Sequence, residues 1–285
     1  MAKSKDSWAP YKSDAKAPDF GGDKLQRAWK QLHAGDGEPF PDEKRAASLI
    51  NAAGKAAPKG LDAKALAAAL QDAWRAFHAG DFKAAFDAGE KLGPVGASVA
   101  VKALGIHATY LVEDGSEQEA RYQRAAALAE AAVKALPDEA NSHYRHAFAL
   151  GRYSQKLSIA KALKMGLAGK VRESLDNALE LDPKHAEAHT ALALYHAEII
   201  AKIGALIGGI TYGAKASEAD KHIKQALKLT PDSPIAHVEH GNLQLLLQGE
   251  RGEDAAAAAY EKAAKLKGRD AMETLDARWA REQIE

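Results

Sequence analysis

A short pattern recurs along this chain, and the repetition constrains its fold more than any other feature. The copies AAVKALP, LDNALELDP and IKQALKLTP are apolar helical stripes that end at Pro137, Pro183 and Pro231. A histidine follows each proline by six residues, at His143, His189 and His237. A weaker fourth copy, YEKAAKLKG, has Gly268 for the proline and Thr274 for the histidine. Self-similarity at periods of tens of residues is typical of stacked helical hairpins that cannot bury their own apolar faces alone. The repeats therefore predict an all-α solenoid.

Composition agrees with a soluble helical protein and excludes several classes of function. The 285 residues are 46% hydrophobic, and the 39 Lys and Arg residues balance the 39 Asp and Glu residues. Because there is no basic excess, we expect neither nucleic acid nor an anionic lipid surface to be recruited by net charge. The absence of cysteine excludes disulfides, thiolate zinc sites and a cysteine nucleophile. No stretch approaches the roughly 20 apolar residues of a membrane span, and the N-terminus lacks an apolar signal-peptide core, so we expect a cytoplasmic protein.

The chain divides into three parts by sequence pattern. Residues 1–22 are polar and contain Pro10 and Pro18, which predicts a disordered tail. Residues 23–124 are expected to form divergent helical repeats, and residues 125–285 regular repeats with a capping helix, in one continuous solenoid. We expect helix pairs at 95–112 with 117–136, 139–165 with 168–182, 186–208 with 215–230 and 234–248 with 252–267, and a last helix at 270–283.

A local duplication marks the N-terminal repeats. The segments LQRAWKQLHAGD, from Leu25 to Asp36, and LQDAWRAFHAGD, from Leu70 to Asp81, match at eight of twelve positions. Both are predicted to be first helices that end at a Gly-Asp turn.

The regular repeats resemble the tetratricopeptide repeat (TPR) family. With the terminal proline placed at the end of each repeat, the second helices carry small, large and small residues where the family does. These residues are Val171, Leu175 and Ala178; Ala219, Ile223 and Ala226; and Ala256, Tyr260 and Ala263. Gly241 lies where the family has its first-helix glycine, whereas histidines replace its usual tryptophan. The resemblance implies a right-handed superhelix of helical hairpins.

Two adjacent repeats are longer than the others. Pro231 to Ala256 spans 25 residues, but the corresponding distances from Pro137 and Pro183 are 34 and 36 residues. The extra material is apolar and lies at 153–168 and 199–214, so two elongated hairpins are expected. The sequence YSQKLSIAKALKMGLAGKVRESLDNALELDP, which ends at Pro183, resembles the elongated hairpin of TPR proteins of the regulator-of-microtubule-dynamics type and their bacterial relatives, including those associated with periplasmic solute transporters. This resemblance implies a binding protein without catalysis.

The apolar inserts must be covered by something if they are not to remain exposed. Three alternatives are open at this point: mutual packing of the two elongated hairpins, a homo-oligomer interface, or the wall of a pocket for an apolar ligand or peptide.

The eleven histidines invite a metal hypothesis. His185 and His189 are spaced i,i+4, and His143 with His146 and His237 with His240 are spaced i,i+3, so each pair shares a helix face. In the repeat register, however, each faces its own repeat's second helix, which favours packing over a metal site. Catalysis through His196 and Glu198 is a weaker hypothesis still. The segments GGDK and GALIGG lack the context of a phosphate-binding loop. We therefore expect no metal, no cofactor and no enzymatic activity.

TPR proteins usually bind partners along the first helices, which line a concave groove. Counted from the terminal prolines, the expected groove residues are Asn141, Tyr144, Phe148, Arg152, Glu187, Thr190, Leu194, Glu198, Val238 and Asn242. They are mixed apolar and polar and lack the basic set with which chaperone-binding repeats clamp a terminal carboxylate. The leading hypothesis is a non-enzymatic scaffold for a protein or peptide of unknown identity. The alternative is a carrier of an apolar small molecule in a pocket formed by the inserts.

Overall fold

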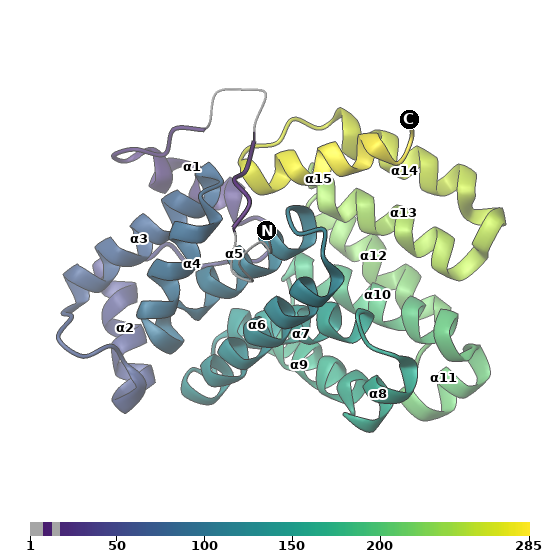
Figure 1. Cartoon of the computed structure of the whole chain (residues 1–285), viewed down its shortest axis with the longest axis horizontal. Helices are drawn as coiled ribbons and strands as arrows, with labels where there is room; N and C mark the ends of the chain where they lie inside the picture. The colour runs from purple at the N-terminus through teal and green to yellow at the C-terminus, as the bar shows by residue number, and fades with distance from the viewer. Residues whose placement is uncertain (1–7, 13–17) are drawn as a thin grey trace, which may run out of the picture. The chain divides into compact units, whose positions relative to one another are not determined.

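The computed structural model describes residues 8–12 and 18–285, and every regular element in these residues is a helix (Figure 1). The elements are α1 (Lys24–Leu32), α2 (Glu43–Ala53), η1 (Gly54–Ala56), α3 (Ala63–Ala79), α4 (Phe82–Lys91), η2 (Gly93–Gly96), α5 (Ala97–Tyr110), α6 (Gly115–Ala135), α7 (Ala140–Gln155), α8 (Ile159–Lys164), α9 (Leu167–Leu181), α10 (Ala186–Ile203), α11 (Ala205–Tyr212), α12 (Ala216–Leu229), α13 (Pro234–Gln248), η3 (Gly249–Gly252), α14 (Glu253–Lys265) and α15 (Ala271–Glu282). The predicted all-α fold of paired helices is confirmed.

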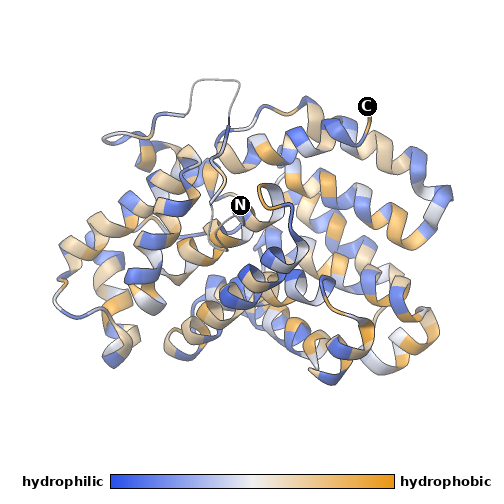
Figure 2. Ribbon diagram, viewed as in Figure 1, coloured by the Kyte–Doolittle hydropathy of each residue, from blue (hydrophilic) through white to orange (hydrophobic). Residues whose placement is uncertain are grey.

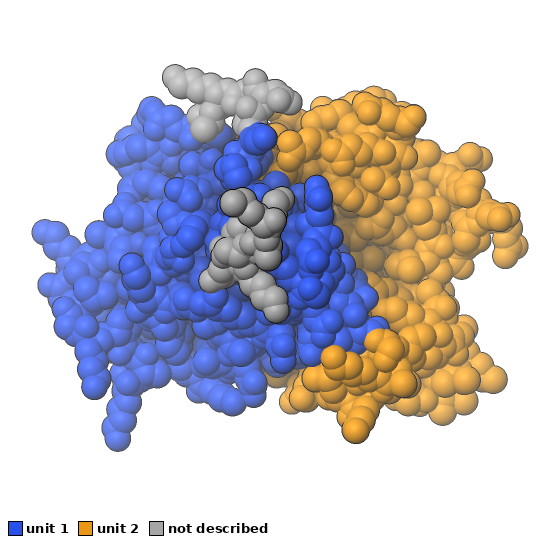
Figure 3. Space-filling view, viewed as in Figure 1, with its two compact units in different colours: residues 1–31, 38–157 blue, residues 32–37, 158–285 orange. Residues whose placement is uncertain are grey.

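The chain forms two compact units, which Figure 3 shows in different colours. Unit 1 comprises residues 1–31 and 38–157, and unit 2 comprises residues 32–37 and 158–285. The boundary at 157/158 falls within the helix pair predicted at 139–182, because α7 belongs to unit 1 and α9 to unit 2. The predicted change from divergent to regular repeats between residues 124 and 125 stays a prediction.

Helix ends follow local capping chemistry. Aspartate side chains accept a hydrogen bond from the backbone N–H three residues later at the starts of α2, α3, α4, α6 and α15. Serine caps α8 and α13 in the same way. At the end of α3, Gly80 adopts the left-handed conformation (φ 90°), and Asp81 then caps α4, so the predicted Gly-Asp turn is present.

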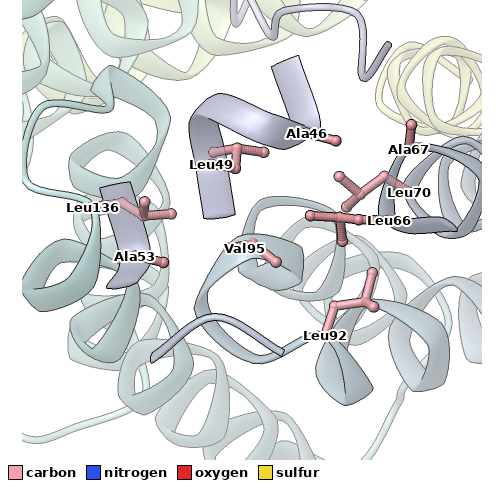
Figure 4. Packing of buried hydrophobic residues seen from close by; sticks show 9 residues of the cluster. All are labelled: Ala46, Leu49, Ala53, Leu66, Ala67, Leu70, Leu92, Val95 and Leu136. Carbon is pink, nitrogen blue, oxygen red and sulfur yellow. The ribbon is translucent and has the colours of Figure 1, made fainter. Parts of the chain in front are cut away.

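In unit 1, an aliphatic cluster joins α2, α3, the η2 turn and the C-terminal end of α6 (Figure 4). Its members are Ala46, Leu49, Ala53, Leu66, Ala67, Leu70, Leu92, Val95 and Leu136. Also in unit 1, the Trp29 and Trp74 rings, at equivalent positions of the duplicated motifs, pack edge to face with centroids 5.8 Å apart. The tryptophans of the two copies are therefore neighbours in space although they are 45 residues apart in sequence.

The N-terminal segment, predicted to be a disordered tail, makes packing contacts at Trp8 and Phe20. Trp8 packs against Phe86, with ring centroids 5.4 Å apart, and Phe20 is buried beside His78. Arg75 donates a hydrogen bond to the Phe20 carbonyl at 3.2 Å. Contacts of such large aromatic side chains offset part of the entropy cost of ordering a polar segment. The rest of that prediction concerns residues 1–7 and 13–17, which lie outside the described residues.

Unit 2 contains the best-matched repeat positions, and all of them are buried. The second-helix residues Val171, Leu175, Ala178, Ala219, Ile223, Ala226, Ala256, Tyr260 and Ala263 form the packing faces of α9, α12 and α14. Gly241 of α13 lies under the Tyr260 ring, and a Cβ atom there would be 2.4 Å from a ring carbon. The first-helix glycine therefore permits close approach of α13 and α14.

The two inserts form short separate helices instead of extending their neighbours. The helix predicted at 139–165 stops at Gln155, and Ser158 caps the new helix α8. The helix predicted at 186–208 stops at Ile203, because Gly204 (φ 82°) turns the chain into α11. Each hairpin is longer than a regular repeat, as expected, but α8 has no buried residue and α11 buries only Gly208. Mutual packing thus does not bury the apolar side chains of these helices.

Candidate binding surfaces

Most of the predicted groove residues of α7 pack against other residues of unit 1. Asn141 and Tyr144 are buried, and the Asn141 amide donates to Glu38 at 2.9 Å. The Phe148 ring packs on Gly105 of α5, where a Cβ atom would be 2.3 Å from the ring. Phe148 and Arg152 remain half-exposed, with the Arg152 guanidinium 5.9 Å from the ring centroid of Phe148. Of the four predicted positions on α7, these two offer surface to a partner.

The predicted groove residues of α10 are partly covered by a segment that lies far away in sequence. The backbone N–H of Glu187 donates to the carbonyl of Gly35 at 2.9 Å, and the Glu187 side chain lies against that glycine. Thr190 is buried and donates to the Ala186 carbonyl. Leu194 and Glu198, farther along α10, are half-exposed, and Glu198 pairs with Lys202 at 3.0 Å.

On α13, the predicted groove residues face the interior of the hairpin. Val238 is buried against α14 and α15, in a cluster that includes Ala256 and Ala280. Asn242 accepts a hydrogen bond from the Tyr260 hydroxyl at 2.7 Å and donates to Glu239 at 2.7 Å. The polar groups of Asn242 therefore hold α13 to α14.

An open pocket lies on unit 2, over α9, α10 and α11, and two of its lining residues, Thr211 and Tyr212, belong to the second insert. It has a volume of about 520 Å³ and is lined by Gly169, Arg172, Glu173, Asp176, Asn177, Tyr195, Thr211 and Tyr212. Arg172 and Asp176 form an ion pair at 2.8 Å, and the guanidinium lies 5.9 Å from the Tyr195 ring centroid. Burial raises the pKa of Tyr195, and its hydroxyl donates a hydrogen bond to the Tyr212 carbonyl at 3.5 Å. This lining combines charged and amide groups with two tyrosine side chains, which suits a peptide ligand.

Three histidines gather where α10 meets α12. The Nδ1 atoms of His189 and His222 are 2.8 Å apart, and the His196 ring stacks on His222 with centroids 6.3 Å apart. His189 Nε2 must donate to the Pro183 carbonyl, so in the neutral ring its Nδ1 accepts and His222 Nδ1 donates. Burial lowers the pKa of His196 and of His222 to about 4. The arrangement is therefore a partly buried histidine cluster in which His189 and His222 share a hydrogen bond and His196 stacks on His222.

The recurring histidines have one shared structural role. The Nε2 atoms of His143, His189 and His237 lie 2.7, 3.1 and 2.8 Å from the carbonyl oxygens of Pro137, Pro183 and Pro231, respectively. Each of these histidines therefore packs at a repeat junction, where it makes a hydrogen bond to the carbonyl of the preceding proline. Within the part of the chain that the structure describes, no group of three or more His, Asp or Glu side chains is arranged to hold a metal ion.

Comparison with known proteins supports the repeat assignment. The crystal structure of a thermophilic TPR protein from Thermus thermophilus is similar to this chain with a TM-score of 0.52 and 17% sequence identity, covering 75% of this chain and 98% of that one. The fold is that of a TPR protein. The resemblance inferred from the repeat positions is thus confirmed at the level of fold.

A family model gives a more local match. The model described as regulator of microtubule dynamics protein 1-3 matches residues 100–204, which include the whole first insert and the beginning of the second. The comparison with curated proteins gives no significant match. None of the helices in the described residues combines the length and apolarity needed to cross a membrane.

Proposed function

We propose that this TPR-fold protein is a non-enzymatic scaffold that binds a protein or peptide partner along its first helices. The observation that carries the proposal is the TPR-type hairpin fold, since the stacked helices of such repeats offer extended surfaces for partners. Part of the surface expected from sequence is available for this role. Phe148 and Arg152 on α7, and Leu194 and Glu198 on α10, are half-exposed members of the proposed groove.

The pocket over α9, α10 and α11 supports a second contact with the same partner. Its Arg172–Asp176 pair and the Asn177 amide offer both donors and acceptors within one open depression. An extended peptide needs such groups because its backbone N–H and C=O groups must be hydrogen-bonded when they are buried.

Affinity capture with matched variants tests this proposal. The baits are the parent chain, a groove variant with Leu194→Asp and Glu198→Lys, and a pocket variant with Asn177→Arg. The control is Leu181→Asp, which changes an apolar residue on α9 that is 43% exposed and outside both surfaces. We expect a protein that binds the parent and control stoichiometrically and is lost from the groove variant. Equal recovery with all four baits, or no stoichiometric protein, would refute the proposal.

The alternative of an apolar carrier has no comparable observation in its favour. Leu206, Ile207 and Ile210 of the second insert project into solvent, and the pocket over α9, α10 and α11 is open and contains an ion pair. Native mass spectrometry of the purified protein distinguishes the two functions, because a carrier retains a small apolar molecule of defined mass.

A further inference from the structure

The tips of the two elongated hairpins combine exposed aliphatic side chains with exposed lysines. On α11, Leu206 is 77% exposed, Ile207 58% and Ile210 80%. On and beside α8, Ile159 is 47% exposed, Leu163 46% and Met165 38%. Six of the nine exposed large hydrophobic residues in the described chain thus fall within the two inserts. The hydropathy colouring of Figure 2 shows the apolar character of α11.

Both short helices lie at the same end of unit 2. Each leads directly into a second helix, α8 into α9 and α11 into α12, and both of these second helices pack against α10. In Figure 1 the two inserts accordingly lie at one edge of unit 2. We call the exposed residues of 158–170 and 202–215 the tip surface.

The local charge of the tip surface differs from that of the whole chain. No Asp or Glu occurs from residue 140 to 172 or from 199 to 217, although the full sequence has equal numbers of acidic and basic residues. Lys161, Lys164, Lys170 and Lys215 are exposed there. Lys202 pairs with Glu198, which lies just outside the second insert. The overall charge balance therefore hides two segments that combine exposed lysines with exposed aliphatic side chains and contain no carboxylate.

We propose that the tip surface docks onto an anionic phospholipid bilayer. Aliphatic side chains at the centre would enter the boundary between headgroups and acyl chains, while the surrounding lysines contact lipid phosphates. Such peripheral docking needs no membrane-spanning helix. The positive charge of the tip surface complements the bilayer's negative surface potential.

The same observations disfavour a second copy of this chain or another protein as the partner of the tip surface. A second copy of this chain would place lysines against lysines, with no carboxylate in either insert to compensate. Protein–protein interfaces are enriched in aromatic residues and arginine and depleted in lysine. The exposed large hydrophobics of the tip surface are all Ile, Leu or Met, and its cations are lysines.

Vesicle co-flotation of the full chain tests the proposal. We expect binding to vesicles of equal parts phosphatidylcholine and phosphatidylglycerol, no binding to phosphatidylcholine alone, and weaker binding as salt is raised. Leu206→Ser with Ile210→Ser removes two exposed aliphatic side chains, and Lys164→Gln with Lys170→Gln removes two charges. Each pair should lower the partition coefficient at least about tenfold.

Matched controls change equivalent residues outside the tip surface. They are Leu181→Ser with Ile284→Ser for the apolar pair and Lys184→Gln with Lys228→Gln for the charged pair, and both should bind like the parent. All four pairs change exposed side chains, so circular dichroism should be the same for each.

Three outcomes would overturn the proposal. The first is no preference for anionic vesicles, and the second is equal binding by the tip and control variants. The third is a dimer of the parent chain in light scattering that becomes a monomer in the Leu206/Ile210 variant without any flotation of the parent. That result would assign the tip surface to self-association.

Discussion

The Nε2–H group of His143 donates a hydrogen bond to the carbonyl oxygen of Pro137, six residues earlier, across 2.7 Å. The same contact joins His189 to Pro183 and His237 to Pro231. Each bond spans the turn between one second helix and the next first helix. It thus gives a partner to a carbonyl at the junction of two repeats, where the regular helical pattern of hydrogen bonds is interrupted. The recurring six-residue interval between proline and histidine in the sequence corresponds to this hydrogen bond.

Replacing His143 should therefore weaken the junction between α6 and α7. We expect His143→Leu to lower the free energy of unfolding by about 1–2 kcal/mol, because the Pro137 carbonyl loses its donor in a partly buried position. His237→Leu should have a smaller effect, since its contact is exposed to water, which can replace the donor. Urea denaturation measures both, and an equal loss for the two variants would contradict this role.

Substitution of Gly241 tests the close approach of α13 and α14. Gly241→Val should destabilise the protein by about 1–3 kcal/mol, because its side chain would overlap the Tyr260 ring. Gly151 is the matched control, since it lies within α7 and a Cβ atom there meets nothing within 4 Å. Gly151→Ala should stabilise by about 0.5–1 kcal/mol. Thermal unfolding that shifts in the same direction for both variants would refute the proposed contact.

Acid should destabilise the folded chain through its buried histidines. Burial lowers the pKa of His107, His196 and His222 to about 4, from an ordinary value of 6.5. Between these values the unfolded chain binds more protons than the folded one, so stability falls as the pH decreases from 6.5 towards 4. The urea midpoint should consequently be lower at pH 5 than at pH 7.

A variant identifies the source of this pH dependence. His222→Gln should reduce the difference between the two midpoints, since the amide keeps a donor for His189 but does not titrate. The histidine account fails if the parent's midpoint is the same at both pH values or if the variant retains the full difference.

The second-helix packing face gives a further test of the repeat register. Ala226 is fully buried in α12, so Ala226→Phe should overpack the hairpin and cost about 1–3 kcal/mol. Unchanged thermal unfolding of this variant would mean that the repeat positions are assigned incorrectly.

The regular part of the fold could be predicted because its packing is local and periodic. The small and large residues at Ala219, Ile223 and Ala226 fix which face of a second helix is buried, and each terminal proline marks where that helix ends. The helix breaks at Ser158 and Gly204 were harder to place, since a capping serine or a glycine is also tolerated within longer helices.

The candidate surfaces depend on contacts between distant segments, which periodicity does not encode. Nothing in the repeat indicates that Glu38 binds Asn141 or that Gly35 binds Glu187, so these groove positions could not be recognised as covered. The pocket near Tyr195 arises because α11 turns back beside α9 and α10, which follows from the break at Gly204. The basic character of the inserts was present in the sequence, but a count over the whole chain concealed it.

The central claim is that the first helices of these hairpins bind a protein or peptide partner. Hydrogen–deuterium exchange of the full chain, with and without the captured partner, tests it most directly. The account predicts slower exchange in the partner complex for the backbone amides of α10, with unchanged exchange in α14. Slower exchange confined to α14, or no change in α7, α10 and α13 when the partner is bound, would contradict it.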